Sequence, residues 1–262
     1  MENVNHTFAI SAYKESPYLE ECIQSLVSQK IKSKIIVCTS TPCEYIENIA
    51  KKYSLPYYIK TTKSDIQDDW NFAYNKADTD WVTVAHQDDI YNEEYSKVIL
   101  ETAKKYDDIN MIYTDYMPIL NGKTGKRDKN SKIKKVLRCP LLIPGFNKIK
   151  FVKKMTLALG NTICCPTVTY NKKRVGDTIF TSELKFSLDW DTFYKFACMK
   201  GRTVYINKPY AYYRIHDGAT TKSFIVNDTR KYDDIYMFNK FWPKWITNLI
   251  MKVYVKAYDT YN

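Results

Sequence analysis

The sequence predicts an α/β protein with a doubly wound, mostly parallel sheet. Short runs rich in β-branched and aromatic residues recur through the first 115 residues, and amphipathic helical patterns separate them. Strands that alternate with helices in this way are typical of parallel sheets with helices on both faces. At 262 residues the chain is also long enough to bury a sizeable core.

The alternation can be followed from the N-terminus. We expect strands at 7–12, 34–39, 56–60, 81–85 and 109–114, and helices at 17–29, 43–53, 66–77 and 93–106. Ser16 before Pro17 predicts the N-cap of the first helix. Ser64 with Gln67 predicts a capping box at the third.

The second half is less regular. We expect a loop entering a strand at 160–170, a helix over 187–200 that Gly201 stops, and a strand at 203–206. The tail over 228–262 has a helical pattern that Pro243 divides into two pieces.

Composition limits the classes of protein. A net charge of +11 and a pI near 9.1 indicate an anionic partner: nucleic acid, a phosphorylated small molecule or a membrane surface. The seven cysteines form no Cys-x-x-Cys pair, which argues against a zinc ribbon. There is no signal-peptide pattern and no apolar run that could span a bilayer. We therefore expect a reduced, cytoplasmic protein.

A strongly basic segment lies between Gly122 and Arg138, where eight Lys or Arg residues accompany a single acid. Such a run is commonly a solvated, mobile loop. The functional alternative is a basic flap over an anionic ligand.

The strand at 81–85 leads directly into His86, Gln87, Asp88 and Asp89. Two neighbouring carboxylates repel each other unless a cation or a basic partner is present. Mg²⁺ and Mn²⁺ favour such oxygen ligands, and ligands of open α/β sheets bind at the carboxyl ends of strands. The alternative is an acidic turn that caps the following helix.

Six motifs in order resemble the family 2 glycosyltransferases, which have the GT-A fold. They are Ser11-Ala12-Tyr13 with Glu15, Leu26-Val27-Ser28-Gln29, Trp70-Asn71 with Asn75-Lys76-Ala77, His86-Gln87-Asp88 with Asp89, Leu188-Asp189-Trp190-Asp191, and Tyr213-Arg214-Ile215-His216. The resemblance covers roughly residues 7–222. It implies a nucleotide-sugar-binding half over 1–115, an acceptor-binding and catalytic half of the same domain over 116–225, and a C-terminal helical extension over 226–262.

The resemblance implies a metal-dependent, inverting hexosyltransferase. A nucleotide-diphosphate sugar, with UDP favoured, would donate to a hydroxyl of a glycan or a lipid-linked acceptor in cell-surface polysaccharide or glycoconjugate synthesis. Asp189 would be the general base, with Asp191 as the alternative. The implied donor contacts are Ser11, Ala12, Tyr13, Glu15, Thr39, Ser40, Asn71, Gln87, Asp89 and Arg214, with Lys222 as an alternative to Arg214 for the diphosphate.

The implied cofactor is Mn²⁺ or Mg²⁺, with Asp88 as the main protein ligand and His86 and His216 as further candidates. Two departures from the family pattern stand out. The acidic pair that usually ends the second strand is replaced by Cys38-Thr39-Ser40-Thr41, which leaves the nucleotide open. His86 stands where the first Asp of Asp-x-Asp is expected, and it could ligate the metal, bind the ribose or pack.

Two functions other than glycosyl transfer are alternatives. A non-catalytic nucleic-acid binder would suit the charge and the 23 tyrosines, but no nucleic-acid-binding motif is present, so we expect no such partner. A sugar nucleotidyltransferase would need a Gly-rich, basic phosphate loop after the first strand, and residues 12–17 do not form one. The basic flap and the Trp- and Lys-bearing tail predict either contact with the inner face of the membrane or packing on the sheet or in a dimer. The oligomeric state stays open.

Overall fold

The computed structural model describes residues 5–120, 122–127, 129–216 and 229–255. The first half consists of β1 (His6–Ala12), α1 (Leu19–Val27), β2 (Lys34–Thr39), α2 (Glu44–Lys52), β3 (Tyr57–Ile59), α3 (Ile66–Lys76), β4 (Trp81–His86), β5 (Ile90–Tyr91) and α4 (Tyr95–Ala103). These elements confirm the predicted alternation. Strands β1 and β4 are almost wholly buried, as expected of strands covered by helices on both faces.

The second half begins within the long strand β6. It consists of β6 (Ile109–Leu120), β7 (Lys123–Thr124), α5 (Lys129–Arg138), η1 (Cys139–Leu142), η2 (Phe146–Lys148), α6 (Lys150–Met155), η3 (Cys165–Thr167), β8 (Val168–Asn171), α7 (Lys172–Val175), α8 (Leu188–Cys198), β9 (Arg202–Ile215), α10 (Thr229–Asn239) and α11 (Lys244–Tyr254). The division that we expect near residue 115 falls inside β6, so the two halves share one sheet.

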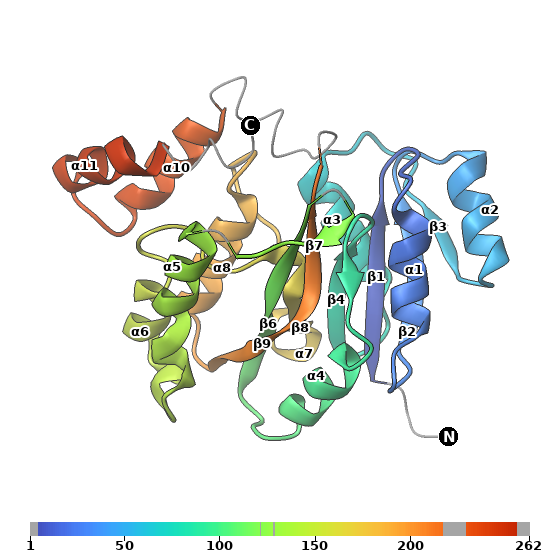
Figure 1. Ribbon diagram of the computed structural model, residues 1–262, viewed down its shortest axis with the longest axis horizontal. Coiled ribbons are helices and arrows are strands. Elements are labelled where there is room, and N and C mark those ends of the chain that lie inside the picture. Colours follow the sequence, from blue (N-terminus) through green and yellow to red (C-terminus); the bar gives the residue numbers. More distant parts are fainter. Residues whose placement is uncertain (1–4, 121, 128, 217–228, 256–262) are drawn as a thin grey trace.

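All the described strands belong to this sheet, in the order β3-β2-β1-β4-β8-β6-β9-β5, with β7 paired to β6. The pairs β1–β2, β1–β4, β2–β3 and β6–β9 are parallel, whereas β8 runs antiparallel between β4 and β6. The predicted α/β class with a mostly parallel sheet is confirmed. Figure 1 shows α1 and α2 at one end of the molecule and α5, α6, α10 and α11 at the other.

The core lies on both faces of the sheet because alternate strand residues point to opposite sides. Phe8 and Ile10 of β1 pack with α1, α2 and α4, whereas Ala9 packs in the cluster that includes α3 and α8. Packing on both faces thus fixes the ends of the strands, and the loops that follow the strands present side chains there.

Three local predictions were wrong. Ser16 does not cap α1, which begins three residues later with Tyr18 at the N-cap; the Ser16 carbonyl instead accepts hydrogen bonds from the Leu19 N–H and the Tyr45 hydroxyl. At α3 the cap is Asp65, whose carboxylate accepts the Asp68 N–H at 3.0 Å. The Ser64 hydroxyl is directed to a different carboxylate, described below.

The third error concerns the basic segment. It is not a mobile loop, because its second half is helix α5 and Arg138 is fully buried. Strand β9 is also much longer than predicted. The two tail helices flank Pro243 as predicted, whereas residues 256–262 and Lys222 lie outside the described residues. No described helix combines the length and the apolar character that crossing a membrane requires.

Candidate functional site

The carboxyl ends of β1, β2 and β4 meet at one edge of the sheet. Ser11 of β1 is in register with Cys38 of β2 and with His86 of β4, and Ala12 is in register with Thr39. The structure therefore brings together the residues that the sequence placed after three separate strands, as parallel pairing requires.

Asp88 follows β4 in a tight turn, and β9 returns to the same place from a distant part of the chain. The Nε2 atom of His216 lies 2.9 Å from Oδ2 of Asp88. Burial by itself raises the pKa of Asp88, but the bond to His216 and the nearby His86 outweigh it, so the pKa lies below its ordinary value. Asp88 is thus held as a carboxylate. The alternative that the acids cap a helix is wrong, because β5 follows them directly.

The His86 side chain packs against an aromatic ring, and one of its ring nitrogens makes no hydrogen bond to a described residue. Its ring stacks on Trp70 with centroids 4.8 Å apart, and burial lowers its pKa. The Nε2 atom is buried and has no hydrogen-bond partner among the described residues. A buried, unpartnered nitrogen beside Asp88 is available to a ligand.

Asp89 has a different environment from Asp88. Its side chain is buried, and its Oδ1 accepts the backbone N–H of Arg214 at 2.9 Å. Burial and the neighbouring Asp88 raise the pKa of Asp89 well above its ordinary value. In this structure Asp89 joins β9 to the strand end and offers almost no surface to a donor sugar.

Arg214 braces the same turn. Its Nε donates to the carbonyl of Asp88 at 2.9 Å and its Nη2 to Oε2 of Glu21 at 2.5 Å, while the guanidinium lies 4.3 Å from the centre of the Tyr18 ring. The donor contact expected of Arg214 therefore competes with an existing ion pair to α1.

The loop after β1 is held by side chains from its neighbours. The amide of Gln87 both accepts from the Tyr13 N–H and donates to the Tyr13 carbonyl, each at 3.0 Å. Lys14 has a positive φ of 55°, and its N–H donates to Oγ1 of Thr41 at 2.6 Å. The ring of Tyr13 is half-exposed and Glu15 is exposed, so both can meet a ligand.

An acid does lie at the end of β2, although it comes from another element. Ser40 donates from Oγ to Oδ2 of Asp69 at 2.8 Å, and the Ser64 hydroxyl donates to the other oxygen. Thr39 is buried, and its hydroxyl accepts the Thr41 N–H. Asp69 was not predicted as a site residue. The sequence feature that could have indicated it is the acidic pair in the first turn of α3.

Asn71 supports the chain that leads into α8. Its Nδ2 donates to the Phe180 carbonyl at 2.6 Å, and its Oδ1 accepts the N–H groups of Phe180 and Ile179. The side chain expected to contact the donor thus positions this segment through both its oxygen and its nitrogen.

Asp189 lies in the first turn of α8 with both oxygens engaged. Oδ1 accepts the Trp190 N–H at 2.7 Å, and Oδ2 accepts Nδ2 of Asn161 at 2.8 Å. Burial raises the pKa of Asp189 to about 6, although these bonds and the nearby Lys134 favour the charged form. Asn161 was missed because it comes from a loop 28 positions away.

Asp191 lies in a different environment. It is buried and forms ion pairs with Lys195 at 2.8 Å and with Lys240, which directly follows α10. These cations lower its pKa despite burial. Asp191 therefore joins α8 to the turn after α10, and two ion pairs occupy its carboxylate.

Cys164 connects the two acidic regions. Burial raises the pKa of its thiol, and the charges of Asp89 and Asp189 raise it further, while Lys134 lowers it. Both carboxylates thus lie within electrostatic reach of one thiol. Cys164 therefore lies in the electrostatic environment of both the strand end of β4 and the start of α8.

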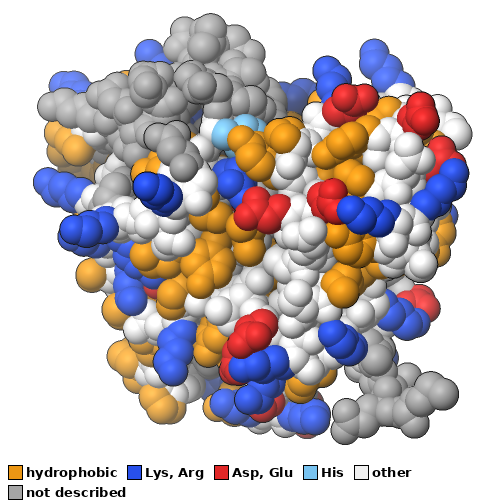
Figure 2. All heavy atoms as spheres, turned by 45° about the vertical axis from the view of Figure 1, so that its right-hand side comes forward, with side chains coloured by type: hydrophobic (Ala, Val, Ile, Leu, Met, Phe, Trp, Pro, Cys, Tyr) orange, Lys and Arg blue, Asp and Glu red, His pale blue; other side chains and the backbone are white. Residues whose placement is uncertain are grey.

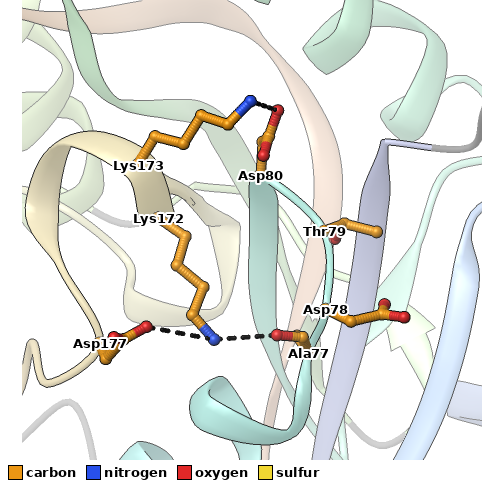
Figure 3. A pocket seen from close by; sticks show the side chains of 7 residues that line it. All are labelled: Ala77, Asp78, Thr79, Asp80, Lys172, Lys173 and Asp177. Atoms are coloured by element: carbon orange, nitrogen blue, oxygen red, sulfur yellow. Dashed lines mark hydrogen bonds and ion pairs between the residues drawn. The ribbon is translucent and has the colours of Figure 1, made fainter.

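Among the described residues, no group of three or more His, Cys, Asp or Glu side chains is arranged to hold a metal. Asp88 and His216 form a pair. A pocket elsewhere, lined by residues 77–80 and by Lys172, Lys173 and Asp177, lies at the opposite end of β4 (Figure 3). Its lysines are satisfied by Asp80, Asp177 and the Ala77 carbonyl, so this pocket does not compete as the site.

Comparison with solved structures gave several similar folds. Staphylococcus aureus TarS, residues 1–349, in complex with UDP-GlcNAc, has a TM-score of 0.62 at 17% identity, covering 94% of this chain and 70% of that one. Pyrobaculum calidifontis mannosyltransferase PcManGT, in complex with GDP-Man and Mn²⁺, has a TM-score of 0.62 at 13% identity, with coverage of 96% and 69%.

A third similar structure is glucosyl-3-phosphoglycerate synthase from Mycobacterium tuberculosis with Mn²⁺ and UDP-Glc. Its TM-score is 0.54 at 12% identity, with coverage of 86% and 75%. Comparison with curated protein sequences gave no match. The family model for glycosyl transferase family 2 matches residues 7–208. With that match and the GT-A fold of these structures, the chain belongs to glycosyl transferase family 2.

Proposed function

We propose that this glycosyltransferase moves a hexosyl group, with inversion, from a nucleotide-diphosphate sugar to a hydroxyl of a glycan or lipid-linked acceptor. Its place would be cell-surface polysaccharide or glycoconjugate synthesis. The observation that carries the proposal is the meeting of Asp88 with His216 at the sheet edge. We place Asp189 on the acceptor side of the same site, which the electrostatic influence of both Asp89 and Asp189 on Cys164 supports.

The metal would be held by Asp88 and His216. Their Oδ2 and Nε2 atoms converge to 2.9 Å, and carboxylate and imidazole ligands together suit Mn²⁺ better than an all-oxygen site would. The Nε2 atom of His86, which has no hydrogen-bond partner among the described residues, is a further candidate metal ligand. Two or three protein ligands leave positions for diphosphate oxygens and water. When bound, the ion would neutralise charge on the leaving nucleoside diphosphate.

The donor would lie along the edge formed by β1 and β2. Tyr13 offers a half-exposed ring, positioned through its backbone by Gln87. Ser11, Ala12, Thr39 and Ser40 end the two strands, and Asp69 would supply the carboxylate that the second strand lacks. UDP is favoured as the nucleotide because two of the three structures described above bind uridine-diphosphate sugars.

Asp189 would act as general base on the acceptor hydroxyl. With a pKa of about 6 it is mainly ionised at neutral pH, yet it is basic enough to accept a proton as the hydroxyl attacks the anomeric carbon. Each of its oxygens accepts one hydrogen bond and keeps a lone pair. Asn161 would orient the carboxylate without contacting the substrate.

All seven cysteines are free, which supports the proposal of a cytoplasmic location. The transfer proposal is tested by thermal unfolding with UDP, GDP, dTDP and CMP, each with and without Mn²⁺. One diphosphate should raise the melting temperature only when Mn²⁺ is present. Asp78→Asn, at the other end of the sheet, should keep that gain and Asp88→Asn should lose it. If no nucleotide stabilises the protein, the donor site is assigned wrongly.

A further inference from the structure

The positive charge of the chain is concentrated in one stretch. Residues 129–176 contain 12 Lys or Arg residues and no Asp or Glu. The whole chain has 40 basic and 29 acidic residues, so outside this stretch 28 basic residues face 29 acids. The stretch thus carries the entire excess of positive charge.

Most of this stretch forms a lobe, residues 129–159, built from α5, η1, η2 and α6. It lies at the end of the molecule opposite α2 (Figure 1). Arg138 fixes it to the sheet through an ion pair with Asp115 at 2.8 Å. Lys153 is buried and donates to the carbonyls of Met199 and Gly201. The lobe is therefore a folded part of the protein, which we call the basic lobe.

The basic lobe exposes apolar side chains over a short span. Phe151 is 71% exposed, and four others between 40% and 47%: Leu142, Ile143, Phe146 and Ile149. Contiguous exposed apolar side chains are uncommon on monomeric proteins and mark interaction surfaces. Packing within the described residues leaves them uncovered.

Lysines are interleaved with these apolar residues. Lys148 and Lys150 flank Ile149, both are exposed, and neither forms an ion pair with an acid of the described residues. The face that carries α1 and α2 differs, because acidic and basic side chains are interspersed on it (Figure 2). There, Lys34 and Lys52 are paired with Asp78 and Glu20.

We infer that the basic lobe docks on the surface of a membrane containing anionic lipids. Its apolar side chains would enter the boundary between headgroups and acyl chains, and Lys148 and Lys150 would meet lipid phosphates. Interfacial protein segments combine these two features, and each contribution alone is weak. The inference concerns a surface outside the donor site and does not depend on the transfer reaction.

The charge of the lobe favours this occupant over others. A second copy pairing symmetrically through the lobe would bring cation against cation. Nucleic acid would satisfy the lysines and could stack on Phe146 and Phe151, but it would leave the aliphatic Leu142, Ile143 and Ile149 in water. A lipid surface satisfies both sets of side chains.

Helix α11 also exposes apolar side chains. Trp245, Leu249 and Val253 are spaced four residues apart, and each is at least 61% exposed. The helix lies at the same end of the molecule as the basic lobe (Figure 1). Its other face packs through Met251, so the exposed stripe is available to a membrane.

The test is flotation of the whole chain with vesicles of phosphatidylcholine, alone or mixed with phosphatidylglycerol, at low and high salt. We expect binding to the mixed vesicles, reduced by salt. Lys148→Glu with Lys150→Glu should weaken partitioning about 30-fold or more, since each lysine contributes roughly fivefold. Ile149→Ser with Phe151→Ser should weaken it comparably, and its residual binding should depend more steeply on salt.

Matched controls lie on other surfaces. Lys104→Glu with Lys105→Glu changes two exposed neighbouring lysines, and Ile59→Ser changes an isoleucine as exposed as Ile149. Both should bind vesicles like the wild type. The inference is overturned if the chain binds neither vesicle, if the controls lose as much binding as the lobe variants, or if the lobe variants only convert a dimer to a monomer. Stronger capture by DNA than by anionic vesicles would also overturn it. Nucleotide stabilisation, measured without vesicles, reports separately on the donor site.

Discussion

His216 and Asp88 are 128 positions apart in the chain, and their side chains meet at 2.9 Å. The contact exists because β9 pairs with β5, the short strand that follows Asp88, and ends beside the turn. The backbone N–H of Arg214 donates to the carboxylate of Asp89, which supports that pairing. The length of β9 thus delivers a histidine to the carboxylate that ends β4.

The bond from Asn161 to Asp189 should control the pH dependence of transfer. In the wild type, kcat/KM should fall as pH drops through about 6, because a protonated Asp189 cannot accept the acceptor proton. Asn161→Ala removes a bond to the charged form, so the pKa of Asp189 should rise and the acidic limb should move up by about one pH unit. Asn75→Ala, on an exposed part of α3, is the control.

The groups facing Asp189 support that assignment. Four groups share its electrostatic environment: Lys134 of α5, Cys164 just before η3, Cys165 of η3 and Tyr170 of β8. Burial raises the pKa of both thiols and of the Tyr170 hydroxyl, so these groups stay neutral near pH 6. An acidic limb that does not move in Asn161→Ala would assign the titration to a different group.

Asp189→Asn should separate chemistry from binding. We expect transfer to fall by about 10²- to 10⁴-fold, the usual contribution of a general base. Stabilisation by the nucleotide and Mn²⁺ should be unchanged, because the proposed role of Asp189 is on the acceptor and not on the donor. Initial rates with a radiolabelled donor, together with thermal unfolding, measure both. Transfer that persists at wild-type rates would show that another residue is the base.

Asp69→Asn should weaken nucleotide binding by roughly tenfold, the value of one charge-assisted hydrogen bond. Asp69 is positioned by Ser40 at the end of β2. Asp68→Asn is the matched control, since Asp68 is adjacent, and its carboxylate reaches Lys60 at 3.7 Å. Isothermal titration with UDP distinguishes the two. Equal affinities in both variants would remove Asp69 from the donor site.

Asp115→Asn should destabilise the fold strongly. The carboxylate is fully buried and contacts three cations: Arg127 at 2.8 Å, Arg138 at 2.8 Å and Lys135 at 3.5 Å. Arg127 and Arg138 lower its pKa despite burial, and removing one partner of a buried ion network costs about 3–5 kcal/mol. Chemical denaturation measures the loss. The exposed Asp107→Asn should change stability little, and a similarly small loss in Asp115→Asn would contradict a role in anchoring α5.

Local patterns were sufficient for the first half of the fold. The strands at 34–39 and 81–85 follow from continuous β-branched and apolar runs, which bury on both faces and need no partner to be recognised. The predicted N-cap of α3 was wrong because Asp65 and Ser64 both offer a side-chain oxygen near the start of this helix. The Ser64 hydroxyl is taken by the carboxylate of Asp69, five positions on, which leaves Asp65 as the cap.

The site was predictable only where its residues follow strands. Asp88 lies at a strand end, which topology marks as a ligand position. Asn161, Asp69 and Asp115 were missed because their importance comes from partners in other elements. The same reason explains why the helix in the basic segment was not predicted. The charge pattern of this segment resembles a solvated loop, and the buried Asp115 that orders it lies outside the segment.

The central claim is that Asp88, with His216, holds a divalent metal that binds the donor diphosphate. Isothermal titration of UDP with and without Mn²⁺ tests it most directly, in the wild type, Asp88→Asn, His216→Ala and the control Asp78→Asn. We predict that Mn²⁺ strengthens UDP binding at least about tenfold in the wild type and in Asp78→Asn. This effect should be lost in Asp88→Asn and reduced in His216→Ala. Equal Mn²⁺ dependence in all four proteins would contradict the claim.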